Sequence, residues 1–230
     1  MLAINHLSFE LPDGSELRVA VSRLLGAGMT NRDQRLIDAH IEELSEQNIP
    51  PPPHIPFLFP AMPTLATNAT DVAVLGVETM PEIEFALFRA EGRDYVTVAS
   101  DQTDRVLEQT HLLVSKNACP KILGAKAWPV DEVAGHWDEI QMRSTSGGKL
   151  LQEGNFAQFI PHADMLEFVA SYDGPEHEGR VVMSGTVPTM AVPNKGKATI
   201  ELALFDPVLD RRLEHAYTVH PMAPIFEEQA

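Results

Sequence analysis

Hydrophobic and polar positions alternate in two short segments at the start of the chain. The first segment spans residues 2–11 and the second spans residues 17–21, with Pro12-Asp13-Gly14 between them. Alternation with a period of two is typical of a strand with one buried face, and a Pro-Asp-Gly sequence favours a turn. The sequence therefore begins with two predicted strands joined by a tight connection.

The next pattern has the period of an α-helix. Between residues 32 and 47 apolar side chains recur at helical spacing, at Leu36, Ile37, Ile41 and Leu44, and acidic residues fill the opposite face. We expect Asn31 to cap this helix and the run of prolines at 50–53 to end it. No Ser/Gly-rich tract or charge block accompanies the prolines, so we interpret them as a rigid connection within one domain.

From residue 70 onward the pattern is mainly that of strands. Short runs rich in β-branched and aromatic residues predict strands at 72–76, 83–88, 95–99, 141–143, 150–152, 181–183, 198–205 and 213–219. Helical patterns separate some of them, near 103–113, 130–138 and 161–170, and Ser146-Gly147-Gly148 predicts a hairpin turn between the strands at 141–143 and 150–152. We predict one domain over 1–230 of the α+β class, with a helix-containing N-terminal section (1–69) and a β-rich core (70–230).

Composition narrows the function classes. Seventeen basic and 33 acidic residues give a net charge of −16, which disfavours binding to nucleic acid or to anionic membranes. No apolar run is long enough to span a bilayer, and the N-terminus does not resemble a secretory signal. The lone Cys119 excludes an intrachain disulfide, and a reducing cytoplasm is the expected location.

The pair Glu82 and Glu84 interrupts an apolar strand. Residues two apart point to the same face of a strand, so both carboxylates face one way. The ordinary interpretation of such a pair is an exposed, solvated strand face. The alternative is a binding site for Mg²⁺, Mn²⁺ or Ca²⁺. The short turn after residue 90 makes the following strand an antiparallel partner, which would bring Asp101 toward the pair as a third carboxylate.

Candidate cations follow Asp101 in the sequence. Ser100 or Asp101 could instead cap a helix, and Arg105 would then be an i,i+4 partner of Asp101 or a cation directed at an anionic substrate. Lys116, taken by itself, does not indicate any function. His40 and Glu43 are one helical turn apart, which suits either a solvated pair or an imidazole activated as a general base.

Other catalytic signatures are missing from the sequence. There is no phosphate-binding loop, dinucleotide fingerprint or nucleophile elbow. The nine histidines show no metal-ligand spacing, and Cys119 is interpreted as buried and inert.

Taken in order, several short motifs resemble those of the fumarylacetoacetate hydrolase superfamily. The similarity spans roughly residues 24–205 and is closest to a bacterial branch without a settled activity. The matching elements are His40-Ile41-Glu42-Glu43, Pro56-Phe57-Leu58-Phe59, Glu82 with Glu84, Ala99-Ser100-Asp101 with Arg105, Lys116, Gln152-Glu153-Gly154-Asn155 and Gly185-Thr186-Val187-Pro188.

The resemblance implies a β-roll-like mixed fold, a homodimer and a divalent metal. By its pattern Glu82, Glu84 and Asp101 would hold Mg²⁺ or Mn²⁺. The resemblance also implies that Arg105, Lys116 and Thr186 face a small anionic substrate, with Lys116 also catalytic. His40 and Glu43 would transfer protons, although the segment Gly28–Asn31 would align Gln34 with the family's histidine instead.

Members of that superfamily act on 2-oxo or 1,3-dicarbonyl acids. The resemblance therefore implies a metal-dependent enzyme, with C–C bond hydrolysis of the acylpyruvate or fumarylpyruvate type as the first expectation. Decarboxylation, hydration, dehydration or isomerisation on the same scaffold is the alternative. A non-catalytic protein that binds small molecules is the alternative from a different class.

Overall fold

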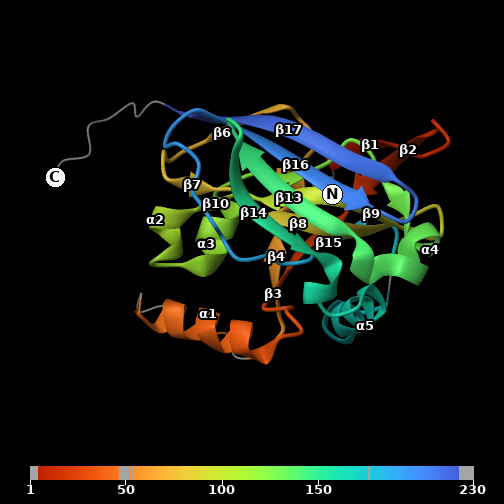
Figure 1. Ribbon diagram of the computed structural model, residues 1–230, viewed down its shortest axis with the longest axis horizontal. Helices are drawn as coiled ribbons and strands as arrows, with labels where there is room; N and C mark the ends of the chain where they lie inside the picture. Colours follow the sequence, from red (N-terminus) through yellow and green to blue (C-terminus); the bar gives the residue numbers. More distant parts are fainter. Residues whose placement is uncertain (1–4, 47–51, 53, 176, 223–230) are drawn as a thin grey trace.

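Two β-sheets packed face to face form the body of the molecule (Figure 1). The computed structural model describes residues 5–46, 52, 54–175 and 177–222. No helix in these ranges has the length and apolar character that a bilayer-spanning segment requires. The β-rich α+β class predicted from the sequence is confirmed.

The larger sheet has eight strands in the order β4-β3-β15-β8-β9-β11-β5, with β12 beside β9. At its centre, β8 and β9 form the predicted antiparallel hairpin, in which Glu84 pairs with Ala99. Glu91 and Gly92 both have positive φ, as a tight two-residue hairpin turn requires. The strands are β3 (Arg23–Gly28), β4 (Phe57–Ala61), β5 (Ala66–Thr67), β8 (Ile83–Ala90), β9 (Arg93–Asp101), β11 (Lys121–Leu123), β12 (Trp128–Pro129) and β15 (Arg180–Met183).

The smaller sheet has five strands in the order β14-β13-β16-β17-β6. Its hairpin around Gly147 and Gly148 was predicted from the sequence and is present. The strands are β6 (Asp71–Val74), β13 (Gln141–Ser146), β14 (Lys149–Asn155), β16 (Ala198–Asp206) and β17 (Arg211–Pro221).

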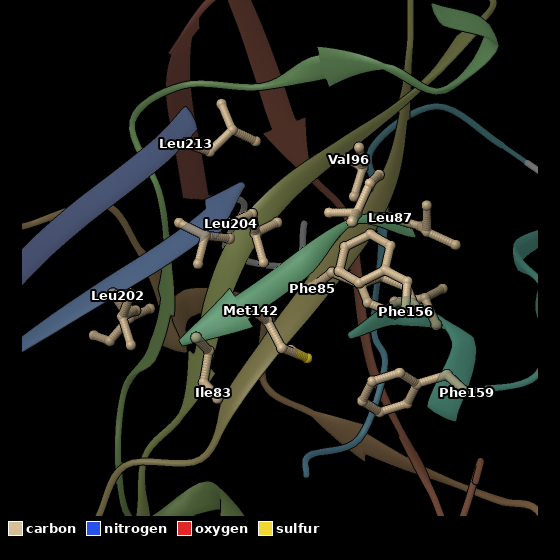
Figure 2. Close-up of a cluster of buried hydrophobic side chains, with 14 of the residues drawn as sticks. Ile83, Phe85, Leu87, Val96, Met142, Phe156, Phe159, Leu202, Leu204 and Leu213 are labelled. Carbon is tan, nitrogen blue, oxygen red and sulfur yellow. The ribbon is translucent and has the colours of Figure 1, made fainter. Parts of the chain in front are cut away.

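The main hydrophobic core lies between these two sheets (Figure 2). From the larger sheet, Ile83, Phe85 and Leu87 of β8 point into it at alternate positions. Leu202 and Leu204 of β16 meet them from the smaller sheet. Because side chains alternate along a strand, the even-numbered residues of β8 point to the opposite face of the larger sheet.

That opposite face carries a second cluster of buried apolar residues. The hairpin of β1 (Asn5–Glu10) and β2 (Glu16–Val21) packs there, and the rings of Phe9 and Phe88 stack at 4.4 Å. Glu84 lies near the other end of β8, on this same face. A small antiparallel pair, β7 (Thr79–Met80) with β10 (Thr103–Asp104), forms beside that end of the sheet.

The helices are short and lie around the sheets. Helix α1 stands apart below the strands in Figure 1, whereas α2 and α3 pack together beside β10. The helices are α1 (Gln34–Glu46), α2 (Arg105–Glu108), α3 (Leu112–Asn117), α4 (Val130–Val133) and α5 (His162–Asp173), with 3-10 turns η1 (Pro63–Leu65), η2 (Ala134–Glu139) and η3 (Phe156–Gln158).

Several local predictions were wrong. Asp33, rather than Asn31, caps α1, because its carboxylate accepts the Arg35 N–H. Of the apolar face predicted for α1, Ile37 is buried but Leu36 is 39% exposed. The prolines at 50, 51 and 53 lie outside the described residues.

The segment predicted as one helix near 103–113 is instead a short strand and parts of two short helices. The strands β3 and β4 of the N-terminal section were not predicted, because Gly and Pro residues interrupt their hydrophobic patterns. Strand β5 was not predicted either, because two residues are too few to show a pattern.

Candidate functional site

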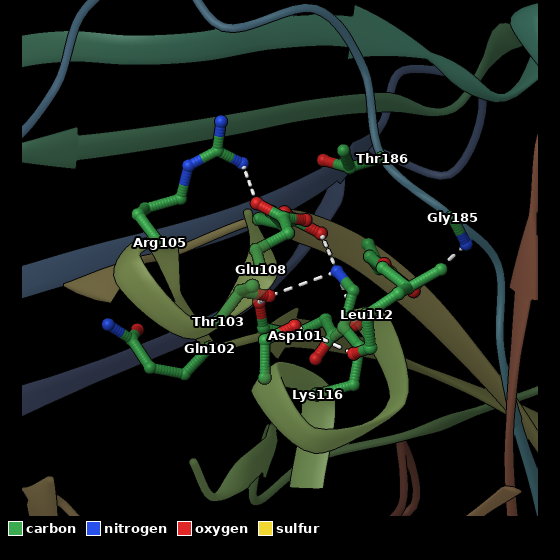
Figure 3. A network of polar contacts seen from close by, with 12 residues as sticks. Asp101, Gln102, Thr103, Arg105, Glu108, Leu112, Lys116, Gly185 and Thr186 are labelled. Carbon is green, nitrogen blue, oxygen red and sulfur yellow. Dashed lines mark hydrogen bonds and ion pairs between the residues drawn. The ribbon is translucent and has the colours of Figure 1, made fainter. Parts of the chain in front are cut away.

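Three carboxylates converge where β8 begins and β9 ends (Figure 3). Glu82 directly precedes β8, Glu84 is its second residue, and Asp101 is the last residue of β9. One oxygen of each carboxylate lies within 4.8 Å of the others. The predicted convergence of Glu82, Glu84 and Asp101 is therefore confirmed, and their role as metal ligands stays a prediction.

Of the three carboxylates, Glu84 is the one whose charged form its surroundings disfavour most. Its side chain is buried, and Oε2 accepts the Gly185 N–H at 2.9 Å. Burial raises the pKa of the Glu84 carboxyl well above its usual range, and the negative charges of Asp101 and Glu82 raise it further. In this arrangement negative charge is under-compensated at Glu84.

Gly185 supplies that N–H from a backbone conformation that favours glycine. Its φ is +82°, and an added Cβ would lie 2.8 Å from the Ala27 carbonyl oxygen. The loop after β15 therefore approaches the carboxylates closely only because this residue has no side chain.

Lys116 of α3 is buried among these carboxylates, as Figure 3 shows. Its Nζ donates to Glu82 Oε2 at 2.7 Å and to the Thr103 hydroxyl at 2.9 Å, and lies 3.1 Å from Asp101 Oδ2. Burial alone would lower the pKa of Lys116, but Asp101 and Glu82 outweigh it and raise the pKa above its usual value. Lys116 is therefore a permanent cation at neutral pH.

A second buried lysine was missed by the sequence analysis. Lys121 has no exposed surface, pairs with Asp101 across β11 and β9, and its Nζ forms an ion pair with Asp101 Oδ1. It also donates to the Gln102 carbonyl at 2.9 Å. Burial opposes ionisation of Asp101, yet Lys116 and Lys121 together lower its pKa, so Asp101 is ionised.

Arg105 is not the i,i+4 helical partner of Asp101, and its predicted role toward an anionic substrate stays a prediction. Asp101 belongs to β9, so it neither caps a helix nor pairs with Arg105, and Asp104 caps α2 instead through the N–H groups of Val106 and Leu107. The Arg105 guanidinium forms an ion pair with Glu108 Oε2.

Glu108 was also missed. Its side chain is 11% exposed, and Figure 3 places it between Arg105 and Lys116. Burial raises the pKa of its carboxyl, while Lys116 acts in the opposite direction. Glu108 is thus a fourth acidic group beside the three convergent carboxylates.

Thr186 lies at the site, but its hydroxyl proton is already engaged in a hydrogen bond within the protein. The hydroxyl donates to the Ile83 carbonyl at 2.7 Å and accepts from Gln152 Nε2 at 2.8 Å. Gln152 is fully buried, and its Oε1 accepts the Ile83 N–H at 2.8 Å. Gln152 therefore fixes the start of β8 to the segment carrying Thr186, and the Thr186 side chain can offer a ligand only a lone pair.

The structure does not test the predicted proton-transfer pair. His40 and Glu43 both belong to α1, but their side chains lie outside the described part of the chain.

Cys119 is buried as expected. Burial raises the pKa of its thiol to about 12, which leaves it protonated and non-nucleophilic.

Comparison with known proteins decides the family. Residues 27–217 match a family model described as "Protein of unknown function (DUF2848)". The chain belongs to this family. A search of curated protein sequences gave no significant match.

Solved structures show which fold this DUF2848 protein has. Fumarylpyruvate hydrolase from Pseudomonas aeruginosa, solved with Mn²⁺ and pyruvate, superposes with a TM-score of 0.68 at 19% identity, over 96% of this chain and 98% of that one. A protein from Oleispira antarctica, provisionally named a fumarylacetoacetate isomerase/hydrolase, gives 0.69 at 17% identity, over 92% and 98%.

A third neighbour carries a different activity in its name. It is 2-keto-3-deoxy-D-arabinonate dehydratase with magnesium and 2,5-dioxopentanoate, with a TM-score of 0.62 at 17% identity, over 88% of this chain and 74% of that one. The DUF2848 protein thus has the fold of the fumarylacetoacetate hydrolase family, and the resemblance inferred from the order of its motifs is confirmed at the level of fold.

Proposed function

We propose that this protein is a divalent-cation-dependent enzyme that acts on a small 2-oxo or 1,3-dicarbonyl carboxylic acid. The observation that carries the proposal is the convergence of Glu82, Glu84 and Asp101 within 4.8 Å. Two buried lysines beside these carboxylates add to the support, since they supply positive charge where an anionic substrate would bind.

The residues present fit Mg²⁺ or Mn²⁺. All three donors are carboxylates, which are the hard oxygen ligands that these ions prefer, and neither histidine nor cysteine belongs to the group. Burial of the Glu84 carboxyl raises its pKa, and the negative charges of Asp101 and Glu82 raise it further. A divalent cation would supply positive charge that favours the ionised carboxylate.

Such a cation, when bound, polarises the carbonyl of an oxo acid and stabilises the negative charge that develops on its oxygen. The protein's own groups complete the site. Lys116 supplies a fixed positive charge rather than a base, because it remains protonated. Gly185 orients Glu84 by a backbone hydrogen bond, and Gln152 orients Thr186.

For the reaction we propose C–C bond hydrolysis of the acylpyruvate or fumarylpyruvate type. The fumarylpyruvate hydrolase among the structural neighbours supports this choice, and the dehydratase keeps dehydration as the second candidate. His40 with Glu43 is proposed as the proton-transfer pair, and Arg105 as a residue that faces the substrate. The proposal includes a homodimer in the cytoplasm, as expected from the sequence.

The test combines metal binding with a substrate screen. Chelator-treated protein is titrated with Mn²⁺ by calorimetry and then assayed against a panel of 2-oxo and acylpyruvate acids with and without Mn²⁺. Glu84→Gln removes one ligand charge, and Glu214→Gln on the exposed face of β17 is the matched control.

We expect one Mn²⁺ per chain, turnover only when metal is present, and loss of both in Glu84→Gln alone. Absence of Mn²⁺ binding by the wild-type protein would contradict the proposal. Binding of metal and acids without turnover of any acid would instead identify a non-catalytic binding protein.

A further inference from the structure

The cations around the candidate site are already paired. Arg105 pairs with Glu108, Lys116 with Glu82 and Asp101, and Lys121 with Asp101. On the adjoining loops Lys195 Nζ lies 2.6 Å from Glu78 Oε1. All 17 lysines and arginines of the sequence lie in the part of the chain that the structure describes.

Glu108 is the residue that forms an ion pair with Arg105. The Arg105 side chain is 42% exposed, whereas that of Glu108 is 11% exposed, so the carboxylate is the inner partner of the pair. Figure 3 shows it on the side of the guanidinium that faces Lys116. An incoming carboxylate must therefore compete with Glu108 to reach Arg105 from within the site.

The charges of the site also limit what it can accept. Four carboxylates, those of Glu82, Glu84, Asp101 and Glu108, face the three cations Arg105, Lys116 and Lys121. A divalent cation would change this surplus of one negative charge into a surplus of one positive charge. One substrate carboxylate then balances the site, and a second one would be in excess.

Two exposed valines adjoin the ion-paired residues in the sequence. Val106 follows Arg105 and is 57% exposed, and Val77 precedes Glu78 and is 54% exposed. The two segments are joined, because the Arg105 N–H donates to the Glu78 carbonyl at 3.0 Å. An uncharged substrate tail would find apolar contacts here rather than a free cation.

We propose that Glu108 restricts the site to oxo acids that carry one carboxylate and an uncharged remainder. This inference rests on the proposed function and narrows it, since acylpyruvates with alkyl tails satisfy the restriction and dicarboxylic acids do not. Glu108 acts as a specificity-determining residue by neutralising Arg105, which a dicarboxylic substrate would need as a second anion receptor.

The test compares two five-carbon acids that differ in one carboxylate, 2-oxopentanoate and 2-oxoglutarate. Their binding to Mn²⁺-loaded protein is measured by calorimetry for the wild type, for Glu108→Gln and for Glu16→Gln. The last variant alters an exposed Arg18–Glu16 ion pair on β2, far from the carboxylates in sequence, and serves as the matched control. Thermal unfolding of each variant verifies that it is folded.

We expect the wild type and Glu16→Gln to bind 2-oxopentanoate at least about tenfold more tightly than 2-oxoglutarate. In Glu108→Gln the affinity for 2-oxoglutarate should rise about tenfold or more, because Arg105 is released to form a charge-assisted hydrogen bond. The affinity of that variant for 2-oxopentanoate should change little.

The inference is overturned if the wild type binds 2-oxoglutarate as tightly as 2-oxopentanoate, or if Glu108→Gln leaves the ratio of affinities unchanged. Failure of the wild type to bind either acid in the presence of Mn²⁺ would be a different result. It would overturn the proposed function itself, and this inference with it.

Discussion

Glu84 and Asp101 belong to one cluster, yet their pKa values move in opposite directions. Both side chains are buried, which disfavours the charged form of each. Asp101 lies against the ammonium groups of Lys116 and Lys121, and these lower its pKa. Glu84 has a backbone N–H as its hydrogen-bond partner and two carboxylates nearby, so its pKa is raised.

This difference predicts a conflict between stability and metal binding at Glu84. A carboxyl with a raised folded-state pKa contributes stability that is fully present below the ordinary pKa of glutamate. That contribution is lost as the pH rises from there through the folded-state pKa. Metal-free Glu84→Gln should therefore melt a few degrees higher than the wild type at pH 8 and lose its response to Mn²⁺.

Thermal unfolding between pH 4 and 8, with chelator and with Mn²⁺, measures both effects. Near pH 4 the two proteins should differ less in melting temperature than at pH 8. The prediction is contradicted if Glu84→Gln is less stable than the wild type at pH 8 and is still stabilised by Mn²⁺. Glu84 would then neither destabilise the metal-free protein nor bind the metal.

Lys121 provides a second prediction at this scale. Replacing it with methionine leaves Asp101 buried with one ammonium fewer, and removing one partner of a buried ion pair typically costs about 3 kcal/mol. We expect Lys121→Met to lower the free energy of unfolding in urea by about that amount. Lys126→Met, which alters an exposed pair with Glu10, should stay within about 0.5 kcal/mol of the wild type.

The sequence predicted the site residues whose arrangement depends on local geometry. Glu82 and Glu84 share a face because strand residues alternate, and Asp101 follows from the short turn between two adjacent strands. Lys121 and Glu108 could not be predicted in this way. Lys121 reaches Asp101 through the register of β11 against β9, and Glu108 is positioned by a helix of four residues.

At the scale of elements, a glycine in β3 supports the site from a distance. Phe59 of β4 pairs with Gly26 of β3, and its ring lies across that glycine, 2.0 Å from where a Cβ would be. Lys116 Nζ lies 5.9 Å from the centre of the same ring. Gly26 thus gives Phe59 the space to lie beside Lys116.

Gly26→Ala should therefore displace Phe59 and disturb Lys116. Overpacking of this kind typically costs about 1–3 kcal/mol, and we expect an unfolding free energy lowered by that amount together with weaker substrate binding. Gly135→Ala is the control, because an added Cβ there meets open space. Normal stability of Gly26→Ala would show that the β3–β4 edge adapts freely.

Helix α1 carries the predicted proton-transfer pair. General acid–base groups typically contribute about 10²-fold or more in rate, so His40→Ala should lose most turnover while it retains the metal. Glu42→Gln, on the exposed surface of the same helix, should keep the wild-type rate. A wild-type kcat for His40→Ala between pH 6 and 8 would remove His40 from the mechanism.

The sequence predicted hairpins where the turn residues were clear. The β8–β9 and β13–β14 hairpins turn at Glu91-Gly92 and Gly147-Gly148, and both were predicted. The region after Asp101 was predicted as one helix, but its helical pattern is divided between the two short helices α2 and α3 after strand β10. The strands β3 and β4 are held by Gly–Phe contacts across the pair, which no single-strand pattern reveals.

At the scale of the whole molecule, the order of weak motifs was more informative than any one of them. The similarity inferred over residues 24–205 corresponds to the matched region 27–217, and the neighbouring structures share the fold. The fold alone accommodates a hydrolase and a dehydratase. The reaction therefore has to be argued from the residues of the site.

The central claim is that Glu82, Glu84 and Asp101 hold one divalent cation. Anomalous diffraction at the manganese edge, from crystals grown with Mn²⁺ and 2-oxopentanoate, tests it most directly. We predict one strong peak per chain, about 2.0–2.3 Å from an oxygen of each of the three carboxylates. A map without a peak at this position, from crystals saturated with Mn²⁺, would contradict the account.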